Sequence, residues 1–299
     1  MQKIVITGCG GMLGEAVYNY FKGKFEVYAT DIDLNEPWLA YLDVRDSEKL
    51  SEFIYKIKPD YVFHLAALTD MEYCEKNPYE AYRTNSFGTE NVAHICKKLD
   101  IPMIYVSTAG VFDGNQDFYS DYDTPAPLSI YGKSKYGGEK FVKEHLHKYF
   151  IFRPGWMIGG GPKKDRKFIS KIIKQIKDGR KELFVVNDKF GSPTYTYDLA
   201  KIIEKVISTG KYGLYNSACE GNCSRIDIVN EILNLNNLNG KIKVNEVGSS
   251  YFKDDFFAPR PREETLSNMK LKMLGINVAR HWKECLKEYM NMHDWGIKA

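Results

Sequence analysis

The chain has 299 residues, of which 43% are hydrophobic and 27% charged, so it can bury a large core as one big domain or two modest ones. Its formal net charge of +3 is too small to indicate nucleic-acid binding, and no uninterrupted apolar stretch approaches the roughly 20 residues of a membrane helix. The six cysteines show no paired or zinc-type spacing, so we expect reduced, structural thiols in a cytoplasmic protein without a metal site.

The first half of the sequence alternates short apolar runs with longer amphipathic ones. The predicted strands are residues 3–7, 25–30, 61–66, 103–107 and 150–153. The predicted helices are residues 14–22, 46–56, 79–99 and 131–147. Continuously apolar strands that alternate with helices predict an α/β fold, in which a doubly wound parallel sheet is covered by helices on both faces.

The alternation loosens after Arg153. The clearest later elements are a basic helix at 165–178, a strand at 183–186 and a helix at 196–208. We therefore expect a sheet domain at 1–155, joined by about 190–212, and a smaller C-terminal lobe, mainly 156–299, that binds substrate.

A glycine motif, Gly8-x-x-Gly11-x-x-Gly14, follows the first predicted strand and opens the first helix. Such a turn lets the backbone approach a pyrophosphate at the positive end of the helix. The motif predicts a Rossmann-type dinucleotide site that includes Met12 and Leu13; the alternative is a purely structural turn.

Two carboxylates follow the glycine motif at the positions that such a site uses. Asp31 ends the second strand, where it would accept hydrogen bonds from the adenosine ribose and repel a 2'-phosphate. The cofactor is therefore NAD(P)H, with NADH favoured. Asp43, beside Val44, is placed to meet the adenine edge, and the alternative for both acids is a solvated strand end.

Tyr131 and Lys135 lie four residues apart on a predicted helix, so they share one face. A phenol has an ordinary pKa near ~10, and we expect the Lys135 ammonium and a nicotinamide charge to lower the pKa of Tyr131. Tyr131 could then protonate a carbonyl oxygen as hydride reaches the carbonyl carbon. Thr108 ends a strand at the edge where such sheets bind ligands, and is a candidate donor to that oxygen; by itself it is merely part of a turn.

With these residues in place, the chain resembles an extended short-chain dehydrogenase/reductase. The matching residues are the glycine motif, Asp31, Leu65-Ala-Ala67, Asn85, Thr108 and Tyr131-x-x-x-Lys135. Further blocks make it similar to the dTDP-4-dehydrorhamnose reductase family: Ala66-Ala-Leu-Thr69, Ser107-Thr-x-x-Val-Phe-Asp-Gly114, Pro127-Leu-Ser-Ile-Tyr-Gly-Lys-Ser-Lys135, Gly138-Glu139, Arg153-Pro-Gly-Trp156, Gly191-Ser-Pro-Thr194 and Arg260-Pro261. These blocks occur in family order over essentially the whole chain.

The resemblance implies an NAD(P)H-dependent reductase of a nucleotide-linked 4-keto-6-deoxy sugar, in the synthesis of deoxy sugars for polysaccharides. Its catalytic residues would be Thr108, Tyr131 and Lys135. Its cofactor would also contact Leu65, Ala66, Ala67 and Asn85. Its nucleotide-sugar substrate would contact Thr69, Thr108, Trp156 and Arg260. From the residues alone, Trp156 is equally a core residue, and Arg260 could be a surface residue held by its prolines.

The sequence departs from the family pattern around the sugar pocket. Ala109-Gly110 stand where the family has Asp-Tyr, Glu72 replaces an Asp, and Pro-Gly follows Arg153 where Thr-Ser is usual. Because sugar-nucleotide 4,6-dehydratases carry an Asp-Glu pair after the Thr, we do not expect dehydration. The exact sugar stays open, as do an epimerase with tightly bound NAD and a non-catalytic regulatory member of the fold. Related enzymes dimerise through the two long helices, which leaves a homodimer open.

Overall fold

The apolar runs of the first half assemble into one sheet in the computed structural model, which describes residues 1–297. All seven strands are parallel, in the order β11-β6-β5-β4-β1-β2-β3. Their bounds are Lys3–Thr7 (β1), Glu26–Asp31 (β2), Ala40–Tyr41 (β3), Tyr61–His64 (β4), Met103–Val106 (β5), Tyr149–Arg153 (β6) and Gly213–Asn216 (β11). The predicted α/β fold class is therefore confirmed.

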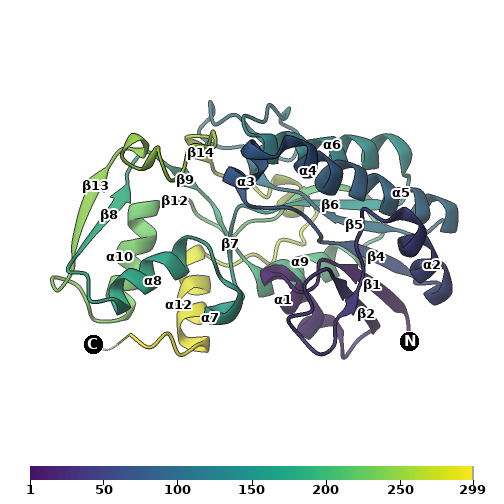
Figure 1. Cartoon of the computed structure of the whole chain (residues 1–299), viewed down its shortest axis with the longest axis horizontal. Helices are drawn as coiled ribbons and strands as arrows, with labels where there is room; N and C mark the ends of the chain where they lie inside the picture. The colour runs from purple at the N-terminus through teal and green to yellow at the C-terminus, as the bar shows by residue number, and fades with distance from the viewer. Residues whose placement is uncertain (298–299) are drawn as a thin grey trace.

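Helices cover both faces of this sheet (Figure 1). One face packs against α1 (Met12–Phe21) and α9 (Thr196–Ile207), which share a core with β1 and β5. The other face packs against α2 (Ser47–Ile57), α5 (Gly88–Leu99) and α6 (Ile130–His145). Because both faces are buried, the strands carry apolar residues at nearly every position.

The predicted helix at 79–99 is one helical stretch with a change of winding inside it. It begins at Pro78 as α4 (Pro78–Tyr82), passes through a π-helical turn at Arg83–Phe87, and continues as α5. The π turn places Asn85 and Ser86 against α6, where the Ser86 hydroxyl donates to the Ser134 carbonyl at 2.8 Å. Single π turns inside α-helices recur at functional sites.

The C-terminal lobe is built from short strands in three small sheets and from helices beside them. Its strands are Trp156–Ile158 (β7), Glu182–Val186 (β8), Phe190–Gly191 (β9), Pro193–Tyr195 (β10), Cys223–Ser224 (β12), Lys243–Val247 (β13) and Glu263–Glu264 (β14). Its helices are Gly161–Lys164 (α7), Phe168–Lys177 (α8), Arg225–Leu235 (α10) and Trp282–Met292 (α12). The predicted basic helix at 165–178 thus begins later, at Phe168, after the separate short helix α7. Residues 298–299 of the predicted lobe lie outside the described part of the chain.

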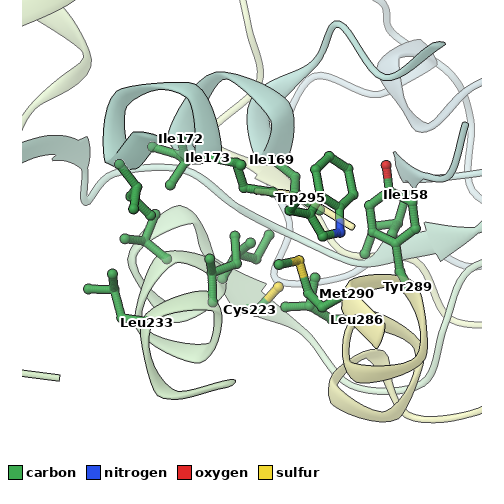
Figure 2. Packing of buried hydrophobic residues seen from close by; sticks show 14 of the residues in the cluster. Ile158, Ile169, Ile172, Ile173, Cys223, Leu233, Leu286, Tyr289, Met290 and Trp295 are labelled. Carbon is green, nitrogen blue, oxygen red and sulfur yellow. The ribbon is translucent and has the colours of Figure 1, made fainter. Parts of the chain in front are cut away.

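A hydrophobic core of its own holds this lobe together. Figure 2 shows isoleucines of α8 facing α10 and α12, with Trp295 and Tyr289 closing one side. The apolar positions Ile169, Ile172, Ile173 and Ile176 recur at helical spacing and are all buried. The chain does not stay in this lobe, since α9 and β11 return to the main sheet.

Two short α-helices and two 3-10 turns, Ala109–Val111 and Ser249–Phe252, complete the described part of the chain. The helices lie near the main sheet. They are α3 (Met71–Lys76) and α11 (Met269–Met273), and the second contributes Leu271 to the core beneath the sheet. Among residues 1–297, no helix has both the length and the apolar character that a membrane span requires.

A buried ion pair fixes α6 to the end of β6. The Arg153 guanidinium donates to Glu139 from Nε at 2.9 Å and from Nη2 at 2.6 Å, and both side chains are at most 2% exposed. The two-pronged geometry satisfies both carboxylate oxygens, which is the condition under which a buried pair holds. Since Glu139 is one turn from Lys135 on α6, the pair also sets the height of that helix over the sheet.

We predict that Glu139→Ala lowers the free energy of unfolding by about 3–5 kcal/mol, because it leaves the Arg153 charge buried without a partner. Chemical denaturation measures this. As a matched control, Asp100→Asn removes an exposed pair with Lys148 and should cost less than about 1 kcal/mol. Equal losses in the two variants would contradict the assignment of the Glu139 pair as a structural clamp.

Candidate active site

The predicted site residues gather at the carboxyl edge of the main sheet. The glycine turn follows β1, Leu65–Thr69 follow β4, and Thr108 follows β5. Tyr131 and Lys135 come from the first two turns of α6. Because the strands are parallel and adjacent, their ends meet at one edge, where open α/β sheets bind their ligands.

The glycine turn has no room for side chains at two of its three positions. Gly8 has a φ of +71°, and a Cβ there would lie 2.3 Å from the Ala66 nitrogen. A Cβ on Gly14 would lie 2.3 Å from the carbonyl oxygen of Cys9, so α1 presses directly onto the turn. Gly11 is the N-cap of α1 and leaves the first N–H groups of the helix to other acceptors. The turn therefore fits a pyrophosphate.

Asp31 braces the turn as well as ending β2. Its Oδ2 accepts the Gly10 N–H at 2.8 Å, and its Oδ1 accepts the Asp33 N–H at 3.0 Å. A carboxylate oxygen can accept more than one hydrogen bond, so Asp31 can still receive ribose hydroxyls. The sequence predicted the contact with ribose hydroxyls but not the hydrogen bond from the Gly10 N–H.

Asp43 and Val44 have close partners within the protein. Arg45 donates to Asp43 from Nε at 2.9 Å and from Nη2 at 2.6 Å, and these bonds hold the pKa of Asp43 below its usual range. The Val44 carbonyl accepts from the Asn91 amide at 2.9 Å. A cavity of about 650 Å³ borders Asp43 and Arg45, so this edge is open to a ligand.

Asn85 holds the loop after β4 against α6. Its Oδ1 accepts the Leu68 N–H at 2.8 Å, and its Nδ2 donates to the Leu68 carbonyl and to the Ser134 hydroxyl, both at 3.0 Å. These bonds keep Leu65, Ala66 and Ala67 over the glycine turn. Asn85 is fully buried, so its placement favours positioning of that loop over direct contact with a cofactor.

Thr108 and Tyr131 come together above β5. The Thr108 Oγ1 caps the short turn Ala109–Val111 by accepting the Gly110 N–H at 3.1 Å. A Cβ on Gly110 would lie 3.4 Å from that oxygen and 3.8 Å from the Tyr131 ring. The small residues Ala109 and Gly110 therefore line the space beside the phenol.

Burial raises the pKa of Tyr131 to about 12, against a smaller lowering by the hydrogen bond from Thr108. The phenol is therefore protonated at neutral pH, which is the form that donates a proton. The expected lowering by Lys135 is not among the influences that the protein alone exerts on Tyr131.

Lys135 is 1% exposed, and its amine has no hydrogen-bond partner among residues 1–297. Its Nζ lies 4.3 Å from the centre of the Tyr105 ring. Burial lowers the pKa of Lys135 to about 7, and the Glu139 charge opposes that shift. A buried amine without an acceptor is costly, so this site fits a ligand that brings hydroxyl groups, as a nicotinamide ribose does.

The predicted sugar-site residues lie where the two lobes meet. The Trp156 indole donates to Glu264 Oε2 at 2.8 Å, and its ring is partly exposed rather than enclosed in the core. Arg260 donates from Nη2 to Oε2 of Glu72 in α3 at 3.0 Å. Thr69 is exposed, and its hydroxyl lies 3.3 Å from Lys167 Nζ. The last two contacts tie the lobes together on the rim of the site.

Three charged residues that the sequence did not single out stand beside Trp156. The Arg225 guanidinium lies 3.6 Å from the Trp156 ring centre and 4.7 Å from that of Phe168. Lys189 donates to the Arg260 carbonyl at 2.9 Å, and Glu264 accepts the Trp156 indole. The sequence feature that could have pointed to one of these residues is the position of Arg225 at the start of a helix. Among residues 1–297, the His, Cys, Asp and Glu side chains form no group of three or more that could hold a metal ion.

Comparison with known proteins places the chain among sugar-nucleotide enzymes. The family described as RmlD substrate binding domain matches residues 1–294. The spore coat polysaccharide biosynthesis protein SpsK of Bacillus subtilis is 30% identical over 295 residues, which cover 97% of both chains.

Two solved structures agree over almost their full lengths. A dTDP-4-dehydrorhamnose reductase from Clostridium acetobutylicum is 34% identical, with a TM-score of 0.88 and coverage of 97% of this chain and 99% of that one. The dTDP-4-dehydrorhamnose reductase of Bacillus anthracis, in complex with NADP, is 32% identical, with a TM-score of 0.89 and coverage of 98% and 100%. The predicted family resemblance is confirmed.

We predict that Lys135→Met raises the melting temperature by several degrees at pH 6–7, because it removes a buried amine without a partner. The folded pKa is about 7 and the ordinary value 10.5, so the unfolded chain binds more protons between these pH values. The cost of Lys135 is therefore largest below pH 7 and fades as pH rises toward 10.5.

Thermal melts of wild type and variant across pH 6–10 measure the effect. Lys133→Met, at an exposed position of the same helix, is the control and should change little. A Lys135→Met protein that is less stable, or a difference independent of pH, would contradict the prediction.

Proposed function

We propose that this chain, which belongs to the RmlD substrate binding domain family, reduces the 4-keto group of a nucleotide-activated 4-keto-6-deoxy sugar with NAD(P)H. The observation that carries the proposal is the pairing of a protonated phenol, Tyr131, with the buried free amine of Lys135 beside a pyrophosphate-type turn. Relatives named dTDP-4-dehydrorhamnose reductase support the reaction type. The identity of the sugar stays open, because another relative is named for spore coat polysaccharide biosynthesis and not for a particular sugar.

The chemistry follows from where each group lies. NAD(P)H, when bound, supplies the hydride for the carbonyl carbon. The Tyr131 hydroxyl gives its proton to the carbonyl oxygen, and the Thr108 hydroxyl donates a hydrogen bond that orients the same oxygen. Lys135 holds ribose hydroxyls with its amine and, when charged, stabilises the phenolate that proton transfer leaves behind.

The cations near Trp156 suit the rest of the substrate. Arg225 lies over the Trp156 ring, Lys189 donates to the Arg260 carbonyl, and the charges of Arg225, Lys189 and Arg260 all lower the pKa of Glu264. Burial lowers the pKa of Arg225 to about 10, which still leaves it charged at neutral pH. Guanidinium groups bind phosphate oxygens in paired hydrogen bonds, so this cluster fits the diphosphate of a nucleotide sugar.

Cofactor choice rests on Asp31. A carboxylate at this place attracts ribose hydroxyls and repels a 2'-phosphate, which favours NADH. The Bacillus anthracis relative was solved with NADP, so a member of this family can bind the phosphorylated cofactor. We propose use of both cofactors with NADH preferred. A homodimer through α5 and α6 remains a prediction.

A panel of 4-keto-6-deoxy sugar nucleotides, each with NADH and with NADPH, tests the function. We expect oxidation of the cofactor with at least one sugar and a lower KM for NADH. No oxidation with any of them would refute the reductase. Purified protein that retains stoichiometric NAD through dialysis, and interconverts two sugars without added cofactor, would identify an epimerase instead.

We predict that Tyr131→Phe lowers kcat by about 10²- to 10⁴-fold, because the proton donor at the carbonyl oxygen is lost. Binding of NADH, measured by fluorescence titration, should change by less than threefold. A variant with wild-type turnover would show that another group donates the proton.

Arg225→Met should weaken binding of a nucleoside diphosphate sugar by about tenfold to a hundredfold, since it removes charged hydrogen bonds to the diphosphate. Calorimetric titration measures this change. Arg180→Met, at an exposed arginine of the same lobe, is the control and should bind like wild type. Equal affinities of the Arg225 variant and wild type would remove Arg225 from the substrate site.

A further inference from the structure

Glu264 is held in a fixed place between the lobes. It lies in β14, which pairs in parallel with β9 so that Glu264 is opposite Gly191. Gly114, with a φ of +82°, lets the chain after Thr108 approach this strand, because a Cβ there would lie 2.7 Å from the Arg262 nitrogen. The loop that carries Thr108 and the strand that carries Glu264 are therefore packed together.

The carboxylate of Glu264 is only half satisfied by the protein. Its Oε2 accepts the Trp156 indole at 2.8 Å, whereas its Oε1 accepts no hydrogen bond among residues 1–297. By contrast, both oxygens of the buried Glu139 are occupied by Arg153. Desolvation raises the pKa of Glu264, against a lowering by its hydrogen bond from Trp156 and by the Arg225 charge. Glu264 is partly exposed, so a ligand can reach the oxygen that the protein leaves without a donor.

Glu264 connects two parts of the candidate site. Its one donor, Trp156, stands on β7 at the junction of the lobes. Its strand packs on the loop that follows Thr108, because a Cβ on Gly114 would lie 3.0 Å from the Glu263 nitrogen. Burial raises the pKa of the Tyr131 phenol, and the Glu264 charge acts in the same direction.

We propose that Glu264 is a specificity-determining residue of the sugar site, whose free carboxylate oxygen accepts a hydrogen bond from a ring hydroxyl at C2 or C3 of the sugar. The inference rests on the proposed function for the identity of the substrate. The inference extends the proposed function by assigning a recognition contact to Glu264 and by naming the sugar hydroxyls that this residue recognises.

A hydroxyl is favoured over an amino group by the surrounding charge. Arg225, Lys189 and Arg260 each lower the pKa of Glu264 through their positive charges. A protonated amino sugar would be repelled by that excess positive charge, whereas a neutral hydroxyl is not. The same positive charges favour the ionised form of the carboxylate, which is the stronger hydrogen-bond acceptor.

Binding of sugar nucleotides tests the contact without depending on turnover. The probes are dTDP-6-deoxyhexose and its 2-deoxy and 3-deoxy counterparts, measured by calorimetry on wild type, Glu264→Ala and Glu264→Gln. Wild type should prefer the fully hydroxylated sugar over one of the deoxy probes by about tenfold to a hundredfold. Glu264→Ala should reduce that ratio to about one, and Glu264→Gln should reduce it several-fold while preserving shape.

The ratio of affinities for the hydroxylated and deoxy sugars distinguishes two roles of Glu264: recognition of a sugar hydroxyl and support of the Trp156 indole. If Glu264 only held the indole in place, both variants would weaken all three sugars equally and leave the ratio unchanged, which would overturn the proposal. Glu263→Gln is the matched control, because Glu263 is the other residue of β14 and accepts from the Thr265 N–H at 2.9 Å. Its ratio should equal that of wild type.

The proposed reductase function and the proposed Glu264 contact can be refuted separately. Wild type that binds the sugars with the expected ratio but oxidises no NAD(P)H would refute the proposed function and keep the Glu264 contact. Wild type that reduces a 4-keto sugar but shows no preference among the three probes would refute the contact alone. Wild type that binds none of the three probes would overturn the contact as well.

Discussion

The candidate site depends on one amine, that of Lys135, which is buried and has no hydrogen-bond partner among residues 1–297. Its helix can lie this close to the sheet because it carries glycines where other segments cross it: a Cβ on Gly132 would lie 2.2 Å from the Gly110 carbonyl, and one on Gly138 would lie 2.7 Å from the Tyr105 hydroxyl. The Arg153–Glu139 pair then locks the helix at that height. Such a site lowers stability where it enables chemistry, as is common at functional sites.

The sheet and its helices could be predicted because their patterns are local. A strand buried on both faces is apolar throughout, and an amphipathic helix repeats every three to four residues, so both are visible in short windows. The π turn at Arg83–Phe87 was not predicted. It accompanies the burial of Asn85 and Ser86 against α6, and the α6 residue that they contact, Ser134, lies about fifty residues further along the chain. The short strands of the C-terminal lobe were not predicted in detail for a related reason, since two-residue strands such as β14 carry no period.

The candidate site shows the same division. Gly8 and Gly14 could be predicted as close-approach positions because the motif itself implies a tight turn, and the structure shows the close contacts. The hydrogen-bond partners of Asp43 and Asn85 could not be predicted, since a hydrogen bond to Arg45 or to Leu68 produces no pattern in the sequence. Glu264 and Arg225 were missed because they reach the site only through the packing of the second lobe on the first. The roles of these residues in binding and catalysis remain predictions.

In the proposed reaction, hydride is transferred to a sugar carbon while Tyr131 protonates the oxygen. Isotope transfer from NADH deuterated at the 4-position of the nicotinamide tests this step directly, with the sugar product analysed by NMR. We expect one deuterium at C4 of the sugar from one face of the nicotinamide, and one NAD⁺ formed per product molecule. A product without deuterium, formed while the NADH in solution is not consumed, would contradict it.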